Sequence, residues 1–307
     1  MKILITDEVH PYLISGFKQK GFSVDYHPNI TLEMVHNLID RYEGIVINTK
    51  IRMDKTLIDK AIHLKCVGRL GSGLDTLDTQ YLSQKGIHYF NTPEANCQAV
   101  AEMALASFLA LARNILLADP ELRNFNWQRE QNRGFEIGSM HFGIFGGGHT
   151  GQAFIKLLQP FDCRIIVYDP NKMLSFENEK IEIAKNMDEL LECSVISLHV
   201  DLNPTTKHLI NKKFIDSMKR PFYLINTSRG AVVQTKDIVE ALQIGKILGA
   251  CLDVFENEKP STFNNEDDKL YSSLYALKNV ILTPHIAGWT FESKLKIAEA
   301  ILRKWPV

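Results

Sequence analysis

The sequence predicts an α/β protein built from two parallel-sheet domains, and three observations support this prediction. Short apolar segments alternate with helical patterns along almost the whole chain, which is typical of βαβ units. Several of these segments are apolar on both faces, as expected for parallel strands that helices cover on each side. The chain has 307 residues, and about 100–200 residues per domain makes two domains the natural expectation.

The predicted strands are segments rich in Ile, Val and Leu. In chain order they cover residues 2–6, 44–49, 64–70, 141–146, 164–169, 194–199, 222–227, 247–254 and 280–285. A long Ala-rich helical pattern at 95–118, followed by an aperiodic polar stretch at 119–139, separates the third strand from the fourth. We therefore expect the chain to cross from one α/β domain to the other in this region. Residues 256–269 are expected to form a long surface loop, and residues 288–305 a final amphipathic helix.

Composition excludes several classes of function. The net charge is −1, so the chain lacks the basic surface expected for binding nucleic acid or an anionic membrane. No apolar run approaches the ~20 residues of a membrane helix, and the N-terminus does not have the pattern of a signal peptide. The five cysteines are scattered and form no CxxC pair, which favours reduced thiols over a disulfide framework or a zinc site. We expect a soluble cytoplasmic protein with a small-molecule substrate and no metal.

A glycine-rich turn is the best local motif. Gly146, Gly148 and Gly151 have G-x-G-x-x-G spacing, directly after an apolar strand and directly before a helical pattern. This is the context of a dinucleotide fingerprint, in which phosphates bind at the helix N-terminus. The next predicted strand ends in Asp169, where a carboxylate would accept hydrogen bonds from an adenosine ribose and repel a 2′-phosphate. The motif therefore predicts NAD rather than NADP; the alternative is a structural turn with a surface aspartate.

Three polar residues follow three successive predicted strands. Arg229, Glu258 and His285 would lie at the carboxyl edge of the sheet, where open α/β sheets bind ligands. Hydride transfer to a 2-keto acid needs a cation for the carboxylate, and arginine offers two parallel donors. It also needs a proton donor, for which histidine titrates in the right range, while a neighbouring carboxylate favours the imidazolium. Each residue alone has an ordinary structural explanation; their order after the fingerprint favours the functional one.

Six segments in sequence carry a family resemblance: "VGRLGSGLDTLD", "NTPEANCQAVAEMAL", "GIFGGGHTG", "NTSRG", "LDVFENE" and "LTPHIAGWT". With them the chain resembles the D-isomer-specific 2-hydroxyacid dehydrogenases over nearly its whole length, and most of all their short 3-phosphoglycerate dehydrogenase branch. The resemblance implies two Rossmann-like domains, one flavodoxin-like and one dinucleotide-binding, with a cleft between them. Residues 1–95 and 286–307 would form a discontinuous substrate-binding domain, and residues 96–285 an inserted NAD-binding domain.

The resemblance also implies roles for individual residues. Arg229 would bind the substrate carboxylate, His285 would be the general acid/base, and Glu258 would be the carboxylate partner of His285. The backbone N–H groups of Ser72 and Gly73 would join the substrate site. The residues implied for NAD are Gly146, Gly148, His149, Thr150, Gly151, Asp169, His199, Thr227, Asp253 and Gly288, with Asp253 on the nicotinamide carboxamide.

Some points stay open in the sequence. The family usually has proline directly after the catalytic glutamate, where this chain has Lys259, so Glu256 remains a rival to Glu258. Lys50 and Arg52 align with a loop that faces the substrate, and they either bind a phosphate or are simply solvated. The resemblance implies a homodimer joined through the NAD-binding domain, and the small-residue face of "AVAEMALASFLALA" is either part of that interface or an ordinary buried face.

The reaction that the resemblance implies is NAD-dependent oxidation of 3-phospho-D-glycerate to 3-phosphohydroxypyruvate, which begins L-serine biosynthesis. A glyoxylate or hydroxypyruvate reductase is the alternative within the same class. A non-catalytic NAD-sensing protein of the same fold is the alternative from another class. The larger members of the branch carry a C-terminal serine-binding domain, and because the chain stops at Val307, inhibition through such a domain is not expected.

Overall fold

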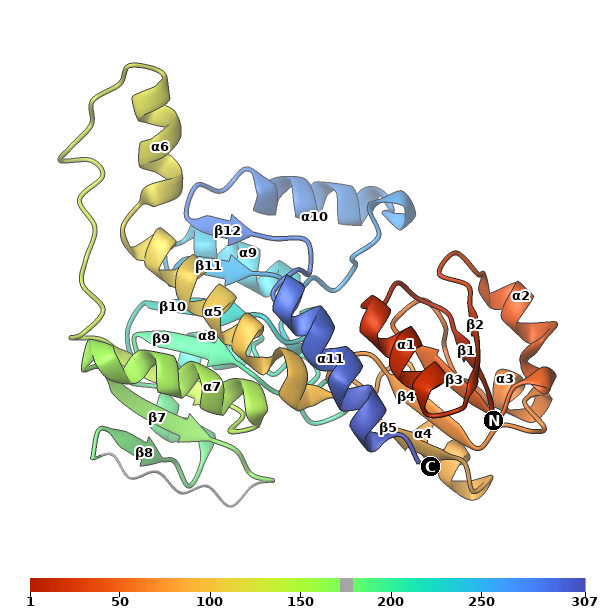
Figure 1. The fold of residues 1–307 in the computed structure, drawn as a ribbon. Helices are drawn as coiled ribbons and strands as arrows, with labels where there is room; N and C mark the ends of the chain where they lie inside the picture. The colour runs from red at the N-terminus through yellow and green to blue at the C-terminus, as the bar shows by residue number, and fades with distance from the viewer. Residues whose placement is uncertain (172–178, 307) are drawn as a thin grey trace. The chain divides into compact units, whose positions relative to one another are not determined.

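The chain folds into two compact units. The computed structural model describes residues 1–171 and 179–306. Unit 1 comprises Met1–Cys97 and Trp289–Val307, and unit 2 comprises Gln98–Gly288 (Figure 1). The chain therefore leaves unit 1, builds the whole of unit 2 and then returns. The expected crossings, after residues 95 and 285, lie two and three residues before these boundaries. The cleft that the resemblance implies stays a prediction.

Unit 1 contains a five-stranded sheet. Its strands are β1 (Lys2–Ile5), β2 (Ser23–Tyr26), β3 (Gly44–Ile47), β4 (Cys66–Arg69) and β5 (His88–Phe90). They lie in the order β2-β1-β3-β4-β5 and every pair is parallel, which is the flavodoxin-like arrangement. One face packs on α2 (Leu32–His36), α3 (Lys55–Lys60) and α4 (Thr79–Gln84). The other packs on α1 (Pro11–Gln19) and α11 (Phe291–Lys304), so the core lies on both sides of the sheet.

The last helix is an integral part of unit 1, and α11 confirms the helix expected at 288–305. Trp305, just past its end, is buried against the glycines of two strands. A Cβ atom at Gly44 would lie 2.5 Å from the indole, and one at Gly68 would lie 2.9 Å from it. Glycine at both positions therefore makes room for the ring. One turn earlier, Leu302 of α11 packs on Gly16 of α1. A Cβ atom at Gly16 would lie 2.3 Å from a methyl group of Leu302.

Unit 2 contains a seven-stranded parallel sheet in the order β12-β11-β10-β9-β6-β7-β8. The strands are β6 (His141–Phe145), β7 (Arg164–Tyr168), β8 (Ile181–Ile183), β9 (Val195–Leu198), β10 (Phe222–Asn226), β11 (Ile247–Leu252) and β12 (Val280–Leu282). Helices α5 (Pro93–Ala112) and α7 (His149–Leu158) cover one face. Helices α8 (Lys212–Ser217), α9 (Thr235–Gln243) and α10 (Asn265–Tyr275) cover the other. The chain reverses direction across the sheet between β6 and β9, and ligands bind at the carboxyl ends beside such a point.

The predicted strands are all confirmed, but three further strands escaped prediction. These are β2, β5 and β8, with the sequences SVDY, HYF and IEI. Each lies at an outer edge of its sheet, where one side of the backbone and part of the side chains face solvent. An edge strand does not need a continuous apolar sequence, so the signal used for the inner strands is missing.

Two helix predictions need correction. The pattern at 95–118 is not one helix, because Asn114 adopts a left-handed conformation (φ 52°) and ends the first helix at Ala112. A second helix, α6 (Ile115–Arg123), then runs into the stretch expected to be aperiodic. The segment 256–269 is not one long loop either. It contains a short 3-10 helix at Pro260–Thr262, and α10 begins at Asn265, where the side chain of Asn264 caps the helix.

Helix α5 also bears on the membrane question. Contrary to the expectation from sequence, this 20-residue helix is long and apolar enough, by length and composition alone, to cross a membrane. Its residues Ala101, Ala104 and Phe108 are fully buried in the core of unit 2. Core helices of globular proteins often have such a composition, and we therefore interpret α5 as a core helix.

Candidate active site

The glycine turn joins β6 to α7 at the switch point of the unit 2 sheet. Gly146 has φ 94°, which favours glycine, and a Cβ there would lie 2.3 Å from the carbonyl oxygen of His199. A Cβ at Gly151 would lie 2.0 Å from the carbonyl oxygen of Gly146, so the turn and the helix pack backbone to backbone. Gly148 begins α7 without a side-chain cap. The first N–H groups of the helix are consequently available to an anion.

Asp169 is held at the turn by two backbone donors. Its Oδ2 accepts a hydrogen bond from the N–H of Gly147 at 2.9 Å, and its Oδ1 accepts one from the N–H of Asn171 at 3.0 Å. A carboxylate with two oxygens can accept about four hydrogen bonds, so each oxygen keeps room for another donor. This carboxylate is therefore fixed where ribose hydroxyls would approach the turn. His149 and Thr150 form the first turn of α7, beside it.

His199 and Thr227 occupy neighbouring strand ends, after β9 and β10. His199 is partly buried, its Nε2 lies 2.9 Å from Ser197 Oγ, and its ring packs on Phe154. Burial lowers the pKa of His199 to about 3, so the ring stays neutral. Its Nδ1 and the Oγ1 of Thr227 are buried and have no hydrogen-bond partner within residues 1–171 and 179–306.

These features fit a dinucleotide. Two buried polar atoms without partners, an uncapped helix start and a turn that admits no Cβ are what bound phosphates and sugars would complete. The sequence-predicted residues of the cofactor motif thus lie at one edge of one sheet. His199 also contributes through its backbone, because its carbonyl lies against Gly146 of the turn.

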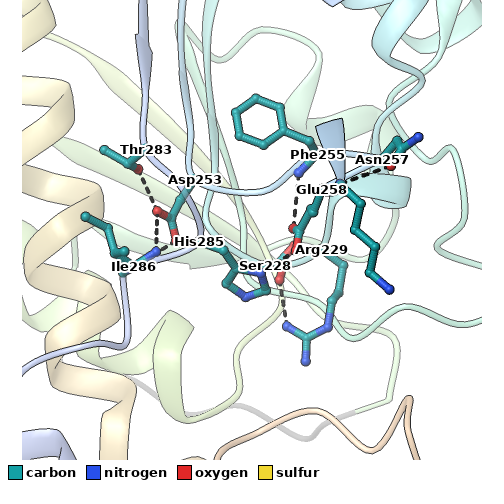
Figure 2. A network of polar contacts seen from close by, with 11 residues as sticks. Ser228, Arg229, Asp253, Phe255, Asn257, Glu258, Thr283, His285 and Ile286 are labelled. Carbon is teal, nitrogen blue, oxygen red and sulfur yellow. Dashed lines mark hydrogen bonds and ion pairs between the residues drawn. The ribbon is translucent and has the colours of Figure 1, made fainter. Parts of the chain in front are cut away.

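His285 and Glu258 form the pair that the sequence predicts. The Nδ1 of His285 lies 2.9 Å from Oε2 of Glu258, and both side chains are partly exposed (44% and 38%). Burial opposes ionisation of Glu258 and is the largest single influence on its pKa. The hydrogen bond and charge of His285, the N–H of Phe255 and the charge of Arg229 together outweigh it, so the pKa of Glu258 lies below its ordinary value. Arg229 lies next to this pair (Figure 2).

The rival glutamate is engaged elsewhere. Glu256 Oε1 lies 2.7 Å from Nε2 of His208, and its Oε2 accepts a hydrogen bond from the N–H of Thr235 at the start of α9. Both oxygens of Glu256 therefore have partners other than His285. Glu258 is the glutamate that contacts His285, although Lys259 and not proline follows it.

The side chain of Asp253 fixes the loop that carries His285. It is buried, and it accepts hydrogen bonds from Thr283 Oγ1 (2.6 Å) and from the N–H groups of Ile286 (2.9 Å) and Ala287 (2.8 Å), as Figure 2 shows in part. His285 adopts a left-handed conformation (φ 56°), which is uncommon and strained for a residue with a side chain. These bonds on both sides of His285 hold it there. The sequence placed Asp253 on the cofactor and missed this contact, as it missed Thr283.

The substrate candidates of unit 1 share one sheet edge. Lys50 and Arg52 follow β3, and Ser72 and Gly73 follow the neighbouring parallel strand β4. The two loops are joined, because the N–H of Met53 donates to the carbonyl of Thr76. Ser72 is held by its hydroxyl, which donates to the side chain of Asn96 at 3.0 Å.

The two basic residues of this edge differ. The ammonium of Lys50 donates to the carbonyl oxygens of Thr6 (2.5 Å) and Pro28 (2.7 Å), so it already serves the fold. Arg52 is exposed, and it makes no hydrogen bond or ion pair with the residues that the structure describes. Of the two, Arg52 is the one available to an anion.

The fold and site together define a class: an α/β protein with a glycine-rich dinucleotide turn and a histidine–glutamate pair at adjoining strand ends. Comparison with known proteins defines the family. The sequence profile of the "D-isomer specific 2-hydroxyacid dehydrogenase, NAD binding domain" matches residues 105–287. The chain belongs to this family, and its unit 2 contains the NAD-binding domain.

Individual relatives differ in their substrates. The chain is 34% identical to a D-3-phosphoglycerate dehydrogenase of Methanocaldococcus jannaschii over 96% of its own length and 55% of the relative's. It is 36% identical to a glyoxylate reductase of Thermococcus litoralis, over 85% of the chain and 78% of that relative. The crystal structure of D-lactate dehydrogenase from Aquifex aeolicus with NAD and lactic acid superposes with a TM-score of 0.86, at 28% identity, over 99% of this chain and 93% of that one. The chain thus spans about half the length of the phosphoglycerate dehydrogenase that it resembles.

Proposed function

We propose that this protein is an NAD-dependent D-2-hydroxyacid dehydrogenase that oxidises 3-phospho-D-glycerate to 3-phosphohydroxypyruvate, at the start of L-serine biosynthesis. The observation that carries the proposal is the His285–Glu258 pair with Arg229 beside it, at the carboxyl edge that also holds the dinucleotide turn. A protein that only sensed NAD would have no use for an acid/base pair, which argues against a non-catalytic role.

The residues of the chain divide the reaction between them. Bound NAD would supply the hydride acceptor for C2 of the substrate. Arg229 would bind the substrate carboxylate through its planar donors. Because Nδ1 of His285 contacts Glu258, its Nε2 is the atom that would take the proton from the C2 hydroxyl, and return it in the reverse direction. Glu258 would stabilise the resulting imidazolium.

Binding of a phosphorylated substrate would fall to Arg52. A phosphate needs an available cation, and Lys50 is already held by two carbonyl oxygens. Ser72 and Gly73, at the end of the adjacent strand, would offer backbone N–H groups to the substrate carboxylate. The phosphoglycerate dehydrogenase relative supports this substrate.

A glyoxylate or hydroxypyruvate reductase is the second candidate, because the chain is equally similar to a glyoxylate reductase and because only Arg52, of the two basic residues considered for a phosphate, is available. The test is the initial rate of NADH formation or consumption with purified protein. Phosphoglycerate with NAD would be compared with phosphohydroxypyruvate, hydroxypyruvate and glyoxylate with NADH. A preference for the phosphorylated pair supports the first proposal, and a preference for the small keto acids replaces it with the second.

Arg52→Ala sharpens this test. If Arg52 binds the phosphate, KM for phosphohydroxypyruvate should rise at least tenfold, equivalent to about 1.4 kcal/mol, while turnover of glyoxylate should not change. Arg41→Ala removes another exposed arginine of unit 1 and is the matched control. Equal effects of Arg52→Ala on both substrates would contradict a phosphate site.

We further propose a homodimer. Helix α6 has no buried residue, and the chain from 115 to 127 exposes five large apolar side chains: Ile115, Leu116, Leu122, Phe125 and Trp127. Phe125 is 98% exposed and Trp127 is 74% exposed, which is costly for a monomer in water. In Figure 1, α6 projects away from the sheet of unit 2. A second copy of the chain would cover this segment and the neighbouring face of α5.

The proposed interface can be tested by light scattering coupled to size exclusion. Replacing Phe125 and Trp127 by Asp should convert a dimer into monomers, whereas Ile244→Asp, at a 77% exposed site elsewhere in unit 2, should not. A monomeric native protein would refute the proposal.

With this small-molecule reaction we also propose a cytoplasmic location.

A further inference from the structure

The turn that carries Arg229 is organised by one buried side chain. Asn226 is the last residue of β10 and is fully buried. Its Oδ1 accepts hydrogen bonds from the N–H of Ser228 (3.1 Å) and from the hydroxyl of Ser228 (3.0 Å). Its Nδ2 donates to the carbonyl oxygen of Arg229 at 3.1 Å. One amide group thus binds three polar atoms of the two residues that follow Thr227.

The other side of the turn is blocked by backbone. A Cβ at Gly230 would lie 1.9 Å from the carbonyl carbon and oxygen of Phe255, so the turn lies directly against the loop that carries Glu258. The position of Asn226 itself is fixed by the sheet, because its carbonyl accepts a hydrogen bond from the N–H of Asp253. The backbone of Arg229 is therefore held between the Asn226 amide and the peptide after Phe255.

The Arg229 side chain depends on the same turn. One guanidinium nitrogen, Nη1, donates to the carbonyl of Ser228 at 2.7 Å (Figure 2). Ser228 is in turn bound through both its N–H and its hydroxyl to Asn226. The Ser228 carbonyl lies between two groups that Asn226 binds, the N–H of Ser228 before it and the carbonyl of Arg229 after it, so Asn226 constrains the peptide that the guanidinium contacts.

We propose that Asn226 is a positioning residue for the reaction, which fixes the guanidinium of Arg229 for the substrate carboxylate without touching substrate or cofactor. This inference rests on the proposed role of Arg229. A displacement of about 1 Å in a substrate-binding group can cost about 100-fold in rate. The contribution of Asn226 should therefore appear in the steps that use Arg229 and nowhere else.

The test is a double-mutant cycle of Asn226→Asp and Arg229→Ala. Asp keeps the acceptor for Ser228 but has no donor for the carbonyl of Arg229. We expect each single variant to lower kcat/KM for keto-acid reduction by about 100-fold or more, and the double variant to be no slower than Arg229→Ala. The Kd for NADH, from fluorescence quenching, should stay within about twofold in Asn226→Asp, which also shows that the variant is folded.

Asn211→Asp is the matched control. Asn211 also accepts a backbone N–H, from Phe214, and donates its amide to a backbone carbonyl, of His208, but it does not contact the Arg229 turn. Its variant should retain full activity. Two outcomes would overturn the role of Asn226 but leave the proposed role of Arg229 intact. In one, the losses in kcat/KM of the single variants multiply in the double variant; in the other, Asn226→Asp is as active as Asn211→Asp. Full activity of Arg229→Ala would overturn the proposed use of Arg229 and the inference with it.

Discussion

The contact between Glu258 and His285 gives the sharpest test of the proposed acid/base pair. Glu258→Gln preserves the shape of the side chain and an oxygen acceptor for Nδ1 of His285, 2.9 Å away, but removes the negative charge. A hydrogen bond to a charged partner contributes about 1.5–3 kcal/mol, against about 0.5–1.5 kcal/mol for a neutral one. The side chains are 44% and 38% exposed, and solvent screening reduces the difference. The two ranges differ by about 1–1.5 kcal/mol, so after screening we expect a loss of about 1 kcal/mol, or about 5-fold in kcat/KM.

The pH dependence of this loss identifies its cause. The effect of Glu258 on His285 depends on the negative charge of the carboxylate. Because the pKa of Glu258 lies below its ordinary value of 4.5, Glu258 remains ionised throughout pH 6–8 in the native protein. The loss in Glu258→Gln should therefore be constant over pH 6–8, and it should shrink only below about pH 4.5, where the native carboxylate also takes up a proton.

The neighbouring glutamate supplies the control. Glu256→Gln makes the same chemical change two residues away, where the partners are His208 and Thr235. It should leave the pH profile of kcat/KM in place. A loss in Glu258→Gln that stays undiminished below about pH 4, or an equal loss in Glu256→Gln, would refute the assignment of Glu258 as the partner of the acid/base.

Three other predictions concern packing and ionisation. Gly230→Ala should lower kcat/KM by more than about 100-fold, because its Cβ would overlap the peptide of Phe255. Gly245→Ala, which has open space around it, should affect only stability. Equal kinetics for both variants would contradict this packing. The pKa of His199 is about 3 in the folded protein and near 6.5 when unfolded, so the unfolded chain binds the extra proton, and stability should fall by about 1.4 kcal/mol per pH unit between pH 6.5 and 3. In thermal unfolding experiments, the stability of His199→Gln should fall less steeply with falling pH than that of the native protein. An equal dependence on pH would contradict this prediction. Because the other four thiols are buried, which raises their pKa, a thiol reagent should modify Cys97 alone in the native protein; rapid reaction of a second thiol would oppose this.

Much of the fold could be predicted because the inner strands are apolar on both faces. Residues such as Ile45, Val67 and Ile196 are completely buried, and only a continuous apolar sequence satisfies that position. The edge strand β2 has no such requirement, and its sequence, SVDY, carries no signal. The break at Asn114 escaped because a left-handed asparagine depends on the local backbone and not on hydrophobic pattern.

The site divides along a similar line. The positions of Arg229 and His285 at the ends of strands could be predicted because each follows an apolar strand in a recognisable motif. The contacts made by Asp253 and Asn226 could not, although both residues stand in those motifs. Their side chains bind backbone atoms whose positions depend on how two loops fold back on the sheet, and sequence spacing does not determine that geometry.

The packing of Trp305 on Gly44 and Gly68 has a consequence for the folding of the chain during its synthesis. The two glycines, in β3 and β4, are synthesised early, but Trp305 is synthesised only after all of unit 2. At about 5–20 residues per second, the ribosome needs roughly 10–40 s to add unit 2. During that time the face of the first sheet that α1 covers still lacks α11, while unit 2, which is contiguous, can fold as it emerges. The domain that contains the N-terminus should therefore be the last to become stable, and its exposed face is where chaperones would bind the nascent protein.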